Sequence, residues 1–247
     1  MSSLHPQMLE FGRNTVVFRE GEPADHFLLV EKGICFTHRH LEDGSRQIID
    51  FYFPREVVAL GELSKAYHIA GLMTLSETVL AAYDKDEITQ EFSSSPELSH
   101  LFINMISEAQ ANLTERLVGL TRYCARQRMA HFLLEVDFRQ RRADGTETRD
   151  FFGKLKQAGL FERPGGSRSQ IRMPQVMIAD SLGLSIVHVN RILRQLREEG
   201  CIATSGQGID LLDMQALKEI AGWTVEKCSL PTGASIPVLS TAALNSG

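Results

Sequence analysis

The chain has 247 residues, with 26 Lys and Arg against 31 Asp and Glu, which gives a formal net charge of -5 and a pI of about 5.9. Its 43% hydrophobic and 23% charged residues are ordinary for a globular protein with one large domain or two smaller ones. No apolar run of about 18 residues occurs, and residues 1–10 lack a basic start followed by an apolar core. We therefore expect a cytoplasmic protein with no membrane span. The cysteines form no CxxC pair, which argues against a zinc site or a disulfide framework: Cys35, Cys124, Cys201 and Cys228.

The charges are distributed unevenly along the chain. Residues 1–100 hold 8 Lys and Arg against 16 Asp and Glu, whereas residues 116–149 hold 8 Arg against 4 acids and residues 163–200 hold 6 Arg against 3 acids. An acidic domain followed by Arg-rich stretches is typical of a sensor joined to a DNA-binding module. Solvated helix faces are the alternative for any single Arg-rich stretch, so motifs have to decide.

The first third of the chain reads as short strands separated by turn residues. Glycines at Gly12, Gly21, Gly33 and Gly44 recur every 9–12 residues, a spacing that predicts an antiparallel sandwich or barrel. The expected strands cover residues 15–18, 27–30, 35–41, 47–53, 68–75 and 78–83.

A long helix is expected next, because Ser95 can cap it, Pro96 can occupy its first position, and apolar residues then recur every three or four positions to about Thr121. A helix of roughly 25 residues needs a partner for this stripe, and a second copy of the chain is the simplest one. Packing on its own β-domain is the alternative. The predicted dimerisation residues are Phe102, Ile106, Ala109, Leu113, Leu117 and Leu120.

Residues 124–141 predict another helix, followed by a turn at residues 143–145 and a polar connection to residue 167. The segment from Met173 to Leu196 then has the features of a helix-turn-helix. Ala179 permits close helix packing, Gly183 suits a turn that requires positive φ, and Ser185 can cap a second helix. The inward-facing residues of this second helix are expected to be Ile186, Val189, Ile192, Leu193 and Leu196. Residues 201–204 and 209–212, joined by residues 205–208, predict a β-hairpin wing.

This order of elements resembles the superfamily of the cyclic-AMP receptor protein and the fumarate-nitrate reduction regulator (Crp/Fnr). The match covers about residues 10–223, and its most specific stretches are residues 179–185, Val189-Asn190-Arg191 and Gly61-Glu62-Leu63. The resemblance implies an α+β protein that acts as a homodimeric transcription factor on a two-fold symmetric operator in double-stranded DNA. Its parts would be an N-terminal antiparallel β-roll sensor domain (1–95), a dimerisation helix (96–123), a C-terminal winged helix-turn-helix domain (124–223) and a disordered tail (224–247).

In the family, the recognition helix reads bases from three positions that correspond here to Ile186, Val187 and Arg191. Only Arg191 keeps the family's residue, and its guanidinium can contact the O6 and N7 atoms of guanine. Val187 can touch a thymine methyl. His188 and Asn190 are further polar candidates, although a phosphate contact or simple exposure is the alternative for His188. The two helix N-termini add expected phosphate contacts at Gln175 and Ser185.

In the family's cyclic-nucleotide binders, a Gly-Glu pair and a later Arg-Ser pair hold the phosphate. Here Gly61-Glu62 is present, but residues 68–71 read His-Ile-Ala-Gly, and no Arg occurs between Arg55 and Arg116. A buried phosphodiester would lack its guanidinium partner, for which Lys65 is a weak substitute, so we expect no binding of cyclic AMP. The candidate effector pocket comprises Gly61, Glu62 and His68. A small-molecule effector and RNA polymerase remain open as further partners.

No cofactor is expected. The oxygen-sensing relatives place most of their iron–sulfur ligands near the N-terminus, but residues 1–34 contain no Cys, and no histidine is marked as a haem ligand. His38 and His40 share one strand face and suggest a cupin-like metal enzyme as the alternative function. The Glu42 spacing and the missing Gly after Pro54 depart from that motif, so we do not expect an enzyme. Cys201 is expected to be a small core residue.

Overall fold

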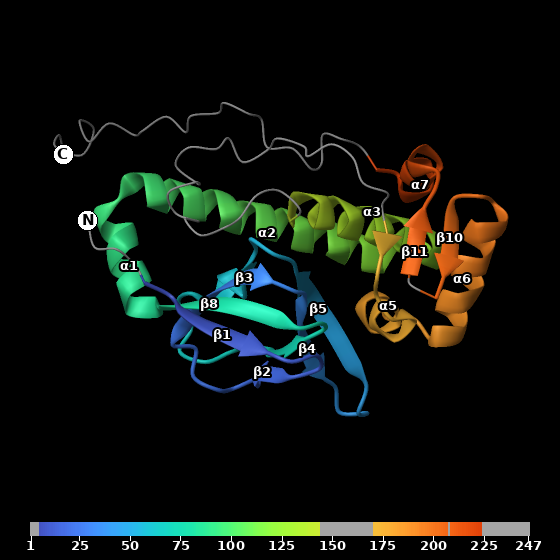
Figure 1. Cartoon of the computed structure of the whole chain (residues 1–247). Helices are drawn as coiled ribbons and strands as arrows, with labels where there is room; N and C mark the ends of the chain where they lie inside the picture. Colours follow the sequence, from blue (N-terminus) through green and yellow to red (C-terminus); the bar gives the residue numbers. More distant parts are fainter. Residues whose placement is uncertain (1–4, 144–169, 207, 224–247) are drawn as a thin grey trace.

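The computed structural model describes residues 5–143, 170–206 and 208–223. The turn and connection expected between residues 143 and 167, and the tail expected at residues 224–247, fall almost wholly outside the described residues. Two four-stranded antiparallel sheets form the N-terminal β-roll domain (Figure 1). In sheet order, the first contains β1 (Gln7–Phe11), β8 (Thr78–Asp84), β3 (His26–Lys32) and β6 (Val57–Val58). The second contains β2 (Val16–Phe18), β7 (Gly71–Thr74), β4 (Cys35–His40) and β5 (Arg46–Tyr52).

Strand β3 shows how the sheets are stacked, because both of its faces are buried. Leu28 and Val30 pack between the two sheets, whereas Phe27 and Leu29 alternate with them and face the helices. A short 3-10 helix, η1 (Leu60–Glu62), follows β6. Strand β3 is thus buried on both of its faces, which explains the continuous apolar run at residues 27–30.

Helix α1 (Lys85–Ser94) and helix α2 (Pro96–Arg122) follow the β-roll directly. The Ser95 hydroxyl accepts a hydrogen bond from the backbone N–H of Leu98 at 3.4 Å, and Pro96 occupies the first turn of α2, as the sequence predicts. Helix α1 and strands β1 and β6 were not expected. The α1 cap is a recognisable signal, because the Asp84 carboxylate accepts hydrogen bonds from the N–H groups of Asp86 and Glu87.

The C-terminal winged domain begins with α3 (Ala125–Ala143), which turns back alongside the second half of α2, so that Arg116 of α2 forms an ion pair with Glu135 of α3 (Figure 1). Helices α5 (Gln175–Leu182) and α6 (Ile186–Glu198) form the helix-turn-helix. The expected wing is present as β10 (Ile202–Ser205) and β11 (Gly208–Leu211), and β11 also pairs with β9 (Gln170–Ile171). Helix α7 (Met214–Ala221) closes the domain against α3. The predicted α+β architecture is confirmed.

Candidate nucleic-acid interface

The turn between α5 and α6 has the geometry that the sequence predicts. Gly183 adopts φ 62° and ψ 40°, a left-handed conformation that suits glycine, and the N–H of Leu184 donates to the carbonyl of Ala179 at 3.0 Å. The two helices are bent by 106° relative to each other, and Ala179 is buried where they approach. The turn therefore fixes the direction in which α6 leaves α5.

Helix α6 has one buried face and one exposed face. Val189, Ile192, Leu193 and Leu196 are buried in a core shared with α3 and α5, whereas Asn190 and Arg191 are exposed and His188 is half-buried. Val187 is 79% exposed. The exposed face thus carries the polar and methyl groups that can meet base edges in a major groove.

The expectation that Ile186 faces inward is wrong, since this side chain is 47% exposed. It is the first residue of α6, directly after the Ser185 cap, and lies a turn ahead of the buried residues. This position joins it to the exposed face, where the family resemblance also places it.

The two expected phosphate contacts lie at helix N-termini. The Ser185 hydroxyl accepts a hydrogen bond from the N–H of His188 at 3.2 Å and so caps α6. Gln175 is exposed at the start of α5, which Pro174 leaves without a side-chain cap. The positive end of the helix dipole lies at a helix N-terminus and favours anionic groups such as phosphate.

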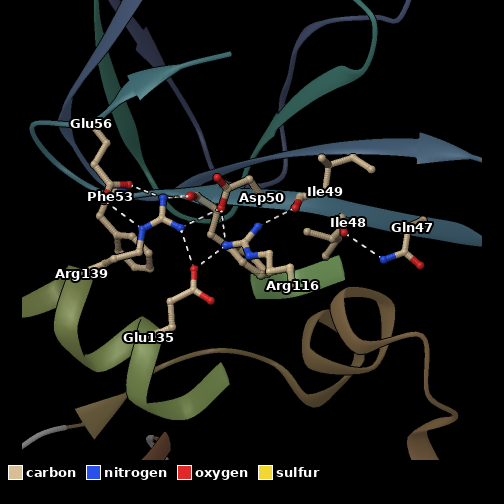
Figure 2. Close-up of polar contacts among 10 residues, drawn as sticks. Gln47, Ile48, Ile49, Asp50, Phe53, Glu56, Arg116, Glu135 and Arg139 are labelled. Carbon is tan, nitrogen blue, oxygen red and sulfur yellow. Dashed lines mark hydrogen bonds and ion pairs between the residues drawn. The ribbon is translucent and has the colours of Figure 1, made fainter. Parts of the chain in front are cut away.

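Two arginines in the stretch 116–149 have a different role from the DNA-facing one that charge alone indicates. Arg116 and Arg139 lie between the β-roll and α3, in a cluster with three carboxylates (Figure 2). Arg139 Nη1 lies 2.7 Å from Asp50 Oδ1, and Arg139 Nη2 lies 2.6 Å from Glu56 Oε2. These arginines join the two domains and do not face DNA, whereas Arg191 and Arg194 on α6 are exposed.

The same cluster controls the ionisation of its acids. Burial alone would raise the pKa of Asp50, but the charges of Arg116 and Arg139 outweigh it and leave this pKa below its usual range. The pKa of Glu135 is lowered in the same way, against its own burial, by these two arginines. Asp50 and Glu135 are therefore ionised at neutral pH, and the cluster holds α2, α3 and β5 together.

The candidate effector pocket is small and occupied by its own side chains. Glu62 and His68 are both buried, with Glu62 Oε2 2.7 Å from His68 Nδ1, and Glu62 Oε1 accepts the N–H of Ile69 at 3.1 Å. His68 also stacks on Phe18 at a centroid distance of 3.4 Å. The cavity they line has a volume of about 20 Å³, close to the space of one water molecule. Gly61, the third expected residue, is not among the residues that line it.

Lys85, which also lines this pocket, is engaged by backbone carbonyl groups. Lys85 Nζ donates to the carbonyl oxygens of Ala24 at 2.8 Å and Glu62 at 3.2 Å. It thus braces the loop that carries Glu62. Lys85 is therefore not available to replace the missing Arg of the cyclic-nucleotide binders.

The histidines of β4 do not form a metal site. His38 is buried and packs edge-on against His40 at a centroid distance of 5.1 Å. Among the described residues, no group of three or more His, Cys, Asp or Glu is arranged to hold a metal ion. Cys201 is buried, as expected for a small core residue, and burial raises the pKa of its thiol.

Helix α2 carries an exposed apolar face from about Ile103 to its C-terminal end. Ile106, Leu113, Leu117 and Leu120 are exposed there, and Leu117 is 63% exposed. Ile103 and Val118, which the sequence analysis did not single out, are exposed as well. Ala109 is half-buried against the β-roll domain.

Phe102 departs from the expected dimer face. It is only 4% exposed and packs on Phe27 and Phe92 of its own chain, with ring centroids 5.3 Å and 3.7 Å away. The first turns of α2 are thus covered by the β-roll domain, which was the alternative for the whole stripe. Phe102 is a core residue and is not available to a second copy.

A β-roll joined by a long helix to a winged helix-turn-helix defines a DNA-binding transcription regulator. Two family models match the chain, the cyclic nucleotide-binding domain over residues 8–95 and the Crp-like helix-turn-helix domain over residues 127–220. The chain therefore belongs to the Crp/Fnr family of transcription regulators. No single helix in the described ranges is long and apolar enough to cross a membrane; only α5 and α6 taken together pass that test by length and composition.

Relatives support the same assignment. The nitrogen fixation regulation protein FixK of Rhizobium meliloti is 28% identical over 83% of this chain and 82% of its own length. The transcriptional activator protein Anr of Pseudomonas protegens is 24% identical over 85% of this chain and 78% of its own length. The structure of FixK2 from Bradyrhizobium japonicum has a TM-score of 0.73 at 22% identity and covers 90% of this chain and 100% of that one. These relatives are transcription regulators, not enzymes.

Proposed function

We propose that this protein is a cytoplasmic, homodimeric transcription regulator that binds a two-fold symmetric operator in a sequence-specific manner and does not require cyclic AMP. The observation that carries the proposal is the exposed face of α6. Val187 and Arg191 on this face stand at positions from which the family reads bases, and Asn190 is exposed beside Arg191. At a promoter, such a regulator would have RNA polymerase as its neighbour.

Arg191 is the main base reader in this proposal. An exposed guanidinium at this position can donate two hydrogen bonds to one guanine, which discriminates by about 1–3 kcal/mol against another base. Ile186 and Val187 offer only apolar contact, so thymine methyl groups are the suitable partners for them. The operator should therefore differ from that of family members with charged residues at these positions.

The exposed apolar face of α2 supports the dimer. Large aliphatic side chains along one helix face favour a second helix as partner, and a symmetric pair would present two copies of α6 to DNA. Replacing Ile106 and Leu113 by Glu should convert the protein to monomers in sedimentation equilibrium. Asn104→Glu adds charge to the opposite side of α2 and should leave the dimer intact; a dimeric double variant would refute this interface.

Independence from cyclic AMP follows from the effector pocket. The space is about that of one water molecule, and the described residues that line it include no Arg to pair with a phosphate. We expect that cyclic AMP changes neither the melting temperature of the protein nor its affinity for the operator. A rise in either one at millimolar nucleotide would contradict this part of the proposal.

The test of sequence-specific binding is selection of random duplex DNA by the purified protein, followed by sequencing. The enriched DNA should be an inverted repeat whose half-site centres lie about one helical turn, 10–10.5 base pairs, apart. Affinity should fall steeply with salt because arginines contact phosphates. DNA without an enriched sequence, or with a single asymmetric half-site, would contradict the proposal.

A further inference from the structure

The β-roll domain holds the helix-turn-helix directly, through strand β5. Arg46 donates from Nε at 2.9 Å and from Nη2 at 2.7 Å to Oδ2 of Asp180 on α5. Its neighbour Gln47 donates from Nε2 to the carbonyl oxygen of Ser181 at 3.3 Å. Two consecutive residues of one domain therefore bind two consecutive residues of the other.

These polar contacts lie over apolar packing that crosses the same boundary. Phe36 and Ile48 of the β-roll belong to one buried cluster with Met177 and Ile178 of α5. The Arg46 guanidinium lies over the Phe36 ring, 5.3 Å from its centroid. Because the ion pair is partly shielded from water by this cluster, it is stronger than a fully exposed pair.

The C-terminal end of α5 is fixed from a second side by α3. Arg128 donates from Nη1 to the carbonyl oxygen of Leu182 at 3.0 Å. The turn at Gly183 follows immediately, and α6 begins at Ile186. A displacement of Asp180 and Ser181 would thus be transmitted through a short turn to the start of the recognition helix.

The contact leaves the DNA-reading face of α6 open. Strand β5 contacts α5 at Met177, Asp180 and Ser181, whereas Val187, Asn190 and Arg191 stay exposed. A block on DNA binding would have to cover that exposed face. The geometry therefore fits a support for the recognition helix and does not fit an obstruction.

We propose that β5 is a built-in positioning element, in which Arg46 and Gln47 orient the recognition helix through Asp180 and Ser181. The β-roll domain would thereby perform a mechanical role in DNA recognition with no ligand bound. This inference rests on the proposed sequence-specific DNA binding.

The experiment measures binding of the full-length protein to its selected operator and to a scrambled duplex of the same length, by fluorescence anisotropy. Arg46→Gln and Asp180→Asn should each lower operator affinity about three- to tenfold, the size of a typical coupling between sites. The double variant should lose no more than either single variant, because both remove one interaction. Affinity for the scrambled duplex should change by less than about twofold, since phosphate contacts are retained.

Two further variants separate positioning from a general loss of charge or stability. Arg39→Gln breaks the Arg39–Glu20 pair inside the β-roll domain and should leave operator affinity unchanged. The charge swap that combines Arg46→Glu with Asp180→Arg should restore selectivity for the operator, which a merely structural loss would not do.

The outcomes are distinct. Wild-type selectivity with unchanged affinity in both single variants would overturn the inference, as would higher operator affinity, which would make the contact a restraint. A wild-type protein that does not distinguish its operator from the scrambled duplex would instead overturn the proposed function.

Discussion

Replacing Arg139 by Ala should destabilise the protein more than any exposed ion pair would. Its side chain is 11% exposed, and its guanidinium contacts the carboxylates of Asp50, Glu56 and Glu135 and donates to the backbone carbonyl of Phe51. Removal leaves three partly buried carboxylates with reduced compensation. Breaking a buried pair in this way costs about 3–5 kcal/mol of unfolding free energy.

The matched control is Arg39→Ala. Arg39 is also paired with a carboxylate, that of Glu20, but its side chain is 55% exposed, so the expected loss is about 0–1 kcal/mol. Urea unfolding at pH 7 measures both variants against the wild type through the midpoint and slope. Equal losses in the two variants, or a loss below 1 kcal/mol for Arg139→Ala, would refute the structural role of the cluster.

Two other variants test the β-roll domain. At Gly33, φ is 85° and an added Cβ would lie 2.1 Å from a backbone carbonyl oxygen, so Gly33→Ala should prevent stable folding. Gly44 also has a positive φ, but the space around it is open, so Gly44→Ala should cost only about 1–3 kcal/mol of backbone strain. Thermal melting compares the two variants, and similar melting temperatures would contradict the packing at Gly33. Burial, and then the basic neighbours His40 and Arg46, lower the pKa of His38. Since His38 then binds a proton more tightly in the unfolded chain, the free energy of unfolding should fall as the pH drops below about 6.5. Urea titrations at several pH values measure this dependence, and His38→Gln should make it less steep. An unchanged pH dependence in this variant would contradict the role of His38.

Local signals explain why the helix-turn-helix was predictable. Ala179, Gly183 and Ser185 each meet a steric or capping need within a few residues, so the sequence itself specifies the motif. The start of α2 at Ser95-Pro96 was predictable for the same reason. The α1 cap at Asp84 carried an equivalent signal that was missed.

Long-range contacts explain what was not predictable. The periodicity of α2 marks an apolar stripe, but only the packing of Phe27 on Phe102 shows where the chain's own β-roll domain covers it. The positive charge of residues 116–149 indicated DNA, yet Arg139 is paired with Asp50 and Glu56, more than 80 positions earlier in the chain. A segment's charge says nothing about such partners.

The effector pocket was predictable only in part, because it depends on both local residues and long-range contacts. The prediction that cyclic AMP is not bound rests on the absence of Arg between Arg55 and Arg116, which is visible in the sequence. The pairing of Glu62 with His68 was not visible, since it depends on how the loop folds back at Ile69. His68 was nevertheless singled out as a pocket residue, and it does line the cavity.

The most direct test of the central claim is the operator affinity of Arg191→Ala, measured beside the scrambled duplex. Loss of a bidentate guanine contact worth about 1–3 kcal/mol corresponds to about five- to hundredfold weaker operator binding. Arg194→Ala removes the same charge from an exposed position three residues later and should weaken both duplexes to a similar extent. A selective loss for Arg191→Ala is the predicted result, and unchanged operator affinity, or an equal loss on both duplexes, would contradict α6 as the element that reads the sequence.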